Sequence, residues 1–159
     1  MFVIKLLILA IIMFGFFAVQ TSRVFEIVGI QPNFIMVAFL VLVGAISYSK
    51  ENFLFVTILE LIFFGLTAFL FPFWTREILI LEALILLAFY LRQFLTGTHT
   101  ADFLILVLGT TFIFYGLLYV LKLTERGWSF VFFEAVYNFV FGLPFWYFLR
   151  KKKYEKIGF

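Results

Sequence analysis

The segment FLFVTILELIFFGLTAFLF, residues Phe53–Phe71, is interrupted by a single ionisable side chain, Glu60. A helix that crosses a bilayer needs about 20 predominantly apolar residues, and this segment has that length. Lipid offers no partners to backbone N–H and C=O groups, so a spanning segment must be helical or part of a closed barrel. Barrel strands alternate polar and apolar residues over about ten positions, and this segment does not. It is therefore predicted to be a transmembrane α-helix.

The rest of the chain has the same character. Hydrophobic residues make up 65% of the 159 positions, charged residues only 13%, and phenylalanine occurs 27 times. A soluble domain of this size cannot remove so much apolar surface from water. We therefore predict an all-α, polytopic bundle of about six transmembrane spans over residues 1–149, followed by a basic tail at 150–159. The predicted spans are Phe2–Val19, Asn33–Tyr48, Phe53–Phe71, Ile78–Leu95, Phe103–Leu121 and Trp128–Leu149.

Two of these spans allow more than one interpretation. The first resembles the apolar core of a signal peptide, but it is long for one and no small-residue cleavage site follows, which favours a retained helix. The second begins either at Pro32, where a proline suits the first helical turn, or earlier, near Val24. Polar turns are expected at Ser49–Asn52 and Thr96–Thr100, and Asp102 is expected to cap the fifth helix.

Charge predicts the topology and excludes several functions. Basic residues favour the cytoplasmic side of a membrane protein. With both termini inside, the inner set holds Lys5, Lys50, Arg92 and five tail cations, twice the outer set of Arg23, Arg76, Lys122 and Arg126. The tail is expected to touch anionic lipid and not nucleic acid. The chain has no cysteine and one histidine, so no metal site or cofactor is predicted.

Three acidic residues within the spans, Glu60, Glu82 and Glu134, are the candidate buried ionisable groups. An ionisable residue at mid-membrane is costly and commonly functional. They suit a proton or cation relay, but they also suit hydrogen bonds that hold helices together. No nucleophile, phosphate loop or other catalytic motif accompanies them, so the protein is predicted not to be an enzyme.

The last span carries a polar stripe. Tyr137 and Asn138 lie three and four residues after Glu134, so the three share one helix face. Gly142 continues the stripe and Pro144 follows it. A polar stripe must face protein or water, so these positions are expected to form a packing or docking surface. In the fifth span, Gly109 and Gly116 are expected to permit close helix contact.

Two stretches resemble one family. They are Ile30-Gln31-Pro32-Asn33 before the second span, and EAVYNFVFGLP, residues 134–144, ahead of an aromatic helix end and a basic tail. With six spans in about 160 residues, the chain resembles MreD, the rod shape-determining membrane protein of bacteria. It departs from that family at Asn33, where aspartate is common, and in a third span with few glycines.

The resemblance implies a non-enzymatic scaffold of the cell-wall elongation machinery in the bacterial inner membrane. It implies a fold similar to the substrate-binding subunits of energy-coupling-factor transporters. The implied partners are an MreC-like membrane protein, the MreB-like cytoskeletal filament and the cell-wall synthases. Its site residues would be Pro32, Asn33, Tyr137, Asn138 and Pro144, as a packing surface.

Two other functions fit the residues. A substrate-binding subunit of a vitamin transporter would need a pocket, which Glu60, Trp128, Glu134 and Asn138 are candidates to line. A membrane-embedded enzyme would use Glu60 and Glu134 as a paired acid and base.

Overall fold

The computed structural model describes residues 2–27, 29–45, 49–94 and 99–155. Within these ranges the chain is helical, and the only β pairing is an isolated bridge between Ile27 and Ile30. This confirms the predicted all-α class. The helices are α1 (Phe2–Ser22), α2 (Phe34–Ala45), α3 (Lys50–Leu70), α4 (Thr75–Leu91), α5 (His99–Val120) and α6 (Trp128–Glu155), with short 3-10 turns η1 (Pro72–Trp74) and η2 (Arg92–Phe94).

Length and composition mark the chain as a membrane protein. In the described part, three helical segments are long and apolar enough to cross a bilayer, namely Lys50–Leu70, Thr100–Val120 and Trp128–Tyr147. Two further apolar segments, Ile8–Ser22 and Phe34–Gly44, are shorter. Since α1 and α2 pack against the longer helices, the short segments belong to the same bundle.

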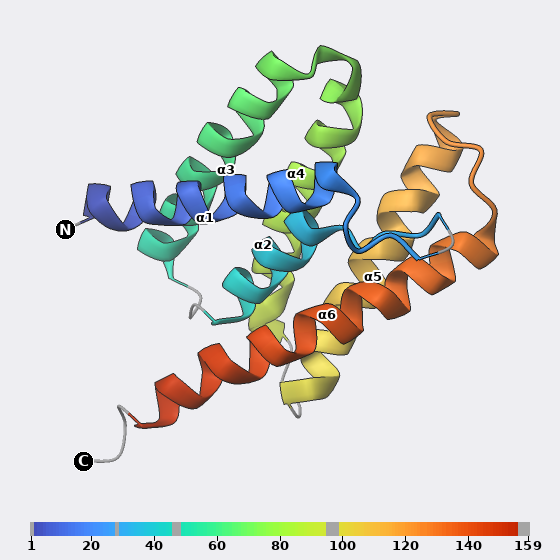
Figure 1. The fold of residues 1–159 in the computed structure, drawn as a ribbon. Coiled ribbons are helices and arrows are strands. Elements are labelled where there is room, and N and C mark those ends of the chain that lie inside the picture. The colour runs from blue at the N-terminus through green and yellow to red at the C-terminus, as the bar shows by residue number, and fades with distance from the viewer. Residues whose placement is uncertain (1, 28, 46–48, 95–98, 156–159) are drawn as a thin grey trace.

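Helix α2 is the centre of the bundle. It lies between α1 and α6 (Figure 1) and also contacts α4 and α5. At about 1.5 Å per residue, its 12 residues extend roughly 18 Å, well short of the ~30 Å hydrocarbon core. A helix that is apolar on every side is stable only when protein or lipid surrounds it. Eight of its side chains are buried: Phe34, Ile35, Met36, Val37, Phe39, Leu40, Val41 and Val43.

Side chains hydrogen-bond to backbone groups at both ends of α2. Asn33 precedes the helix, and its Oδ1 accepts a hydrogen bond from the Met36 N–H at 3.0 Å, the geometry of an N-cap. Near the other end, Arg92 Nη1 donates to the Val43 carbonyl at 2.6 Å. The helix therefore starts after Pro32, which lies outside the cap and not in the first turn. The alternative start near Val24 is wrong, because residues 23–25 form a turn.

Several predicted connections are shorter than expected. Ser49 caps α3 by accepting from the Asn52 N–H at 3.1 Å, so most of the predicted turn at Ser49–Asn52 is the first turn of α3. Likewise, α4 begins at Thr75, three residues before the predicted Ile78. The sequence predicts these polar residues to lie in loops. They can lie within the first turn of a helix, because a capping side chain, water or lipid headgroups provide their hydrogen-bond partners.

The last two helices also differ from expectation. His99 and Thr100, predicted to lie in a loop, open α5, so Asp102 lies inside the first turn and is not the cap. The rest of that predicted loop, residues 96–98, is outside the described residues. Helix α6 continues past the predicted end at Leu149, as far as Glu155, so the basic tail begins as helix.

Aromatic rings fill the core. Phe39 of α2 packs against Phe63 and Phe64 of α3, with ring centroids 5.7 and 5.2 Å apart. On the other side, Phe103 of α5 stacks on Trp146 of α6 at 4.7 Å. Such pairs contribute about 0.5–1.5 kcal/mol each beyond the area that they bury. They place α2 between two aromatic layers.

Gly142 lets α6 approach α2 and α5 closely. A Cβ at this position would lie 2.5 Å from Phe103 Cζ and 2.9 Å from Val37 Cγ1. Gly109 and Gly116 of α5 face open space, with nothing within 4 Å of an added Cβ. The prediction of close helix contact is therefore wrong for these two glycines.

We expect Gly142→Ala to lower the free energy of unfolding by about 1–3 kcal/mol, the usual cost of overpacking a close contact. Gly109→Ala is the matched control, because it adds the same methyl group to a helix interior with free space around it. Thermal unfolding in detergent would compare the two. Equal stability of both variants would contradict the packing described here.

Candidate functional site

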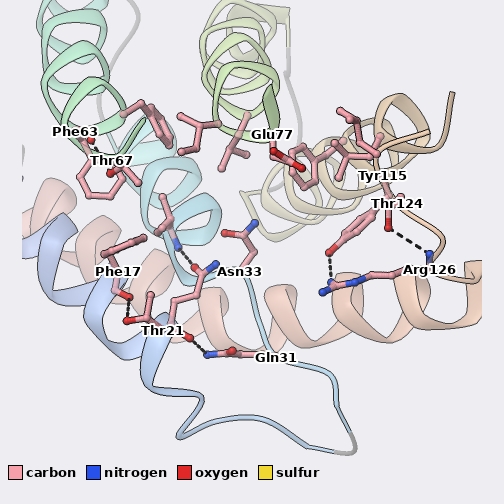
Figure 2. Close-up of a pocket in the computed structure, with 18 of the residues that line it drawn as sticks. Phe17, Thr21, Gln31, Asn33, Phe63, Thr67, Glu77, Tyr115, Thr124 and Arg126 are labelled. Atoms are coloured by element: carbon pink, nitrogen blue, oxygen red, sulfur yellow. Dashed lines mark hydrogen bonds between the residues drawn. The ribbon is translucent and has the colours of Figure 1, made fainter. Parts of the chain in front are cut away.

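A cavity of about 500 Å³, lined by both polar and apolar side chains, lies at one end of the bundle. It is formed where α1, α3 and α5 end and where α2 and α4 begin, together with the segment before α6 (Figure 2). This is the end that the charge bias predicts to face outside the cell. Its polar lining residues are Gln20, Thr21, Arg23, Gln31, Asn33, Thr67, Glu77, Tyr115, Thr124 and Arg126.

Asn138 joins three helices below this cavity. Its Oδ1 accepts from the Asn33 backbone N–H at 2.6 Å, and its Nδ2 donates to Thr111 Oγ1 at 3.3 Å. Thr111 in turn donates to the Val107 carbonyl at 2.8 Å. Asn138 is fully buried, and these bonds use its amide in both directions. The two stretches that carry the family resemblance thus meet at one hydrogen bond.

Glu134 belongs to a second network, one turn nearer the cavity. Tyr115 donates its hydroxyl to Glu134 Oε2 at 2.5 Å, and Arg126 Nη1 donates to the Tyr115 oxygen at 3.0 Å. The same guanidinium nitrogen lies 3.6 Å from Glu134 Oε2, and the guanidinium carbon sits 4.4 Å from the Phe130 ring centroid. The buried carboxylate is therefore paired and hydrogen-bonded.

The segment between α1 and α2 forms part of the cavity wall. Gln31 Nε2 donates to the Gln20 carbonyl at 2.6 Å, while Gln20 Oε1 accepts from the Ile35 N–H at 3.2 Å. Tyr137 donates its hydroxyl to the Phe25 carbonyl at 2.8 Å, which ties the segment to α6. Tyr137 therefore connects this segment to α6. The segment turns at Gly29, where φ is +77°, a conformation that suits glycine.

Glu60 and Glu82 lie apart from the cavity. Glu60 is fully buried, neither of its oxygens has a hydrogen-bond partner among the described residues, and Glu82 of α4 is close enough to act on its charge. Glu82 is only partly buried. Glu134 interacts with Tyr115 and Arg126 instead, so the acidic residues form two separate groups. Within the described ranges, no three His, Asp or Glu side chains gather as a metal site would need.

The residues predicted to line the pocket of a transporter subunit differ from those that line the observed cavity. Glu60, Asn138 and Trp128 do not line the cavity, and Trp128 is more than half exposed. Glu134 lines a smaller neighbouring cavity of about 170 Å³, which Arg126 and Tyr115 share.

Sequence reasoning missed Glu77, Gln20, Tyr115 and Arg126. A signal for Tyr115 exists, since Thr111 and Tyr115 are four residues apart on α5, as Glu134 and Asn138 are on α6. When two antiparallel helices each carry polar residues four positions apart, Thr111 can lie beside Asn138 while Tyr115 lies beside Glu134. The other three residues sit at helix ends, where a polar residue is ordinary and carries no such signal.

No known protein family matches the chain in a comparison with family profiles, and neither a curated protein nor a solved structure matches it. What the chain does must therefore be argued from the site and from the resemblance in its two motifs.

The pairing of Arg126 with Glu134 predicts a non-additive stability effect. Arg126→Gln leaves the buried Glu134 carboxylate with Tyr115 as its partner, so we expect it to lower the free energy of unfolding by about 1–3 kcal/mol. This cost is smaller than that of breaking a fully buried ion pair, because 53% of the arginine side chain is exposed. Adding Glu134→Gln should recover part of the loss, since a neutral amide needs no counter-charge.

Thermal unfolding of the two single variants and the double variant forms the test. Glu125→Gln, in the same connection but outside the cavity lining, serves as the control. Strict additivity of the two substitutions would show that the ion pair carries no coupling.

Proposed function

We propose that this chain is a non-enzymatic membrane scaffold of the bacterial cell-wall elongation machinery, similar to MreD. It spans the inner membrane six times with both termini in the cytoplasm. Its partners are an MreC-like membrane protein, the cytoskeletal MreB-like filament and the wall synthases. The observation that carries the proposal is the hydrogen bond between Asn33 and Asn138. The two stretches that resemble the family meet at this bond, between residues 105 positions apart in the sequence.

The surroundings of this bond support a scaffolding role. The polar groups of Asn138, Thr111 and Asn33 hydrogen-bond within the protein, so few donors or acceptors remain for a substrate. They hold α6 against α2 and α5, so one face of α6 is fixed inside the bundle. The opposite face of α6 is apolar and exposed, as lipid or a partner helix in the membrane requires. Its exposed side chains include Phe132, Phe133, Val136, Val140 and Tyr147.

The structure suggests how such a scaffold works. A rigid α6 presents a constant apolar face within the membrane, and the connections before α2, α4 and α6 present polar groups at the predicted outer face. A membrane partner whose soluble part lies outside could contact both. Recognition would then depend on α6 keeping its orientation, which the Asn138 bonds set.

A cell-shape assay tests this proposal. We expect rod-shaped cells that lack the gene to become round and the full-length chain to restore the rod. Asn138→Leu should restore it poorly, because the substitution leaves the Asn33 N–H without its partner, at a cost of about 1–3 kcal/mol. Thr57→Val, which removes a hydroxyl that donates to the Phe53 carbonyl of its own helix at 2.9 Å, is the matched control.

Co-purification gives a second readout. The full-length chain should recover the MreC-type protein of its own genome from solubilised membranes, and Asn138→Leu should recover less at equal membrane content. Normal shape in the deletion strain, together with failure to co-purify, would contradict the scaffold function.

A second candidate, the substrate-binding subunit of a small-molecule transporter, is favoured by one observation. The 500 Å³ cavity falls in the range of ligand pockets. That function requires a pair of ATPases, so recovery of an ATPase pair in the same purification would support it over the scaffold.

A further inference from the structure

The charges around the cavity do not balance. Arg23 lies 3.7 Å from Glu26, and Arg126 lies 3.6 Å from Glu134, so each of these cations has a carboxylate of its own. Glu77 lines the same cavity, and its Oε2 is buried without a hydrogen-bond partner among the described residues. The cavity therefore contains one carboxylate oxygen that the protein itself leaves unsatisfied.

A buried acceptor without a donor is unfavourable, and more so when the group carries charge. Glu77 lies in the first turn of α4, where the helix dipole favours negative charge. The dipole stabilises the carboxylate but donates no hydrogen bond to Oε2. In Figure 2 the Glu77 carboxylate lies on the α4 side of the cavity, between Thr67 and Tyr115.

The remaining walls suit an organic molecule. Phenyl rings of α1, α3 and α5 line the cavity beside Glu77, and they offer flat apolar surface and the negative faces that attract cations. The side-chain amides of Gln20 and Asn33 lie at the α2 side. The described residues hold no cluster of acidic or histidine ligands for a metal ion. The aromatic lining residues are Phe17, Phe63, Phe64, Phe114 and Tyr115.

We propose that this cavity binds a small organic cation whose N–H groups, in an amidinium or a primary ammonium, donate to Glu77. Its apolar body lies against the phenyl rings. An anion is disfavoured because both lining arginines are already paired, and a neutral molecule leaves the Glu77 charge uncompensated. This inference does not rest on the scaffold function, since a scaffold and a transporter subunit could each carry such a site.

A matched set of ligands tests the charge requirement without altering the protein. Benzamidine, benzamide and benzoate share one ring and differ in charge. We expect benzamidine to raise the unfolding temperature of the full chain in nanodiscs by ~2–4 °C at saturating concentration, and the other two to raise it by much less. An equal shift with benzamide, or none with benzamidine or with the ring-extended cation naphthamidine, would overturn the proposal.

Variants then locate the site. Glu77→Gln should abolish the benzamidine shift, while Glu125→Gln, an exposed acidic residue outside the cavity, should keep it. If Glu77→Gln does not fold, Glu77→Asp replaces it and should weaken the shift, because the shorter side chain withdraws the carboxylate. A benzamidine shift that survives at Glu77→Gln would place binding elsewhere and overturn the assignment.

Discussion

The hydrogen bond from the Asn33 N–H to Asn138 Oδ1 is the contact on which the rest of the bundle depends. Helix α2 is short and begins at the wall of the cavity, where its first N–H groups have no partner in a preceding helical turn. The Asn33 side chain satisfies one of them, at Met36, and Asn138 satisfies another. The Gln20 side chain accepts from a third, at Ile35, so three side-chain amides satisfy the start of this central helix.

The position of the cavity follows from the same arrangement. The described residues before α2, 23–27 and 29–33, form part of the cavity wall and hydrogen-bond to Gln20 and Tyr137. The longer neighbours α3 and α5 extend past that start and form walls around the space above it. Polar groups gather there because helix ends and connections supply them. Among the described charged residues that line the cavity, Arg23 and Arg126 each have a carboxylate partner, and Glu77 Oε2 has no hydrogen-bond partner.

Sequence predicted the helical class and singled out Asn33 and Asn138, which hydrogen-bond to each other, because lipid makes every polar residue in an apolar run informative. The predicted helix boundaries were less accurate. Capping by Ser49 and Asn33 depends on backbone geometry, and polar residues near helix ends resemble loop residues in a sequence. The cavity could not be predicted. Glu77 and Arg126 look like ordinary interfacial charges, and only the packing of three distant connections brings them together.

The proposed topology, in which six helices cross the membrane and the cavity faces outside, can be tested by labelling. The chain contains no cysteine, so a single cysteine reports one position without background. Glu125→Cys, beside the cavity, should react with a membrane-impermeant maleimide on spheroplasts. Glu51→Cys, at the exposed start of α3 on the other end of the bundle, should react only after lysis. Labelling of position 51 on intact spheroplasts, or protection of position 125, would contradict the account.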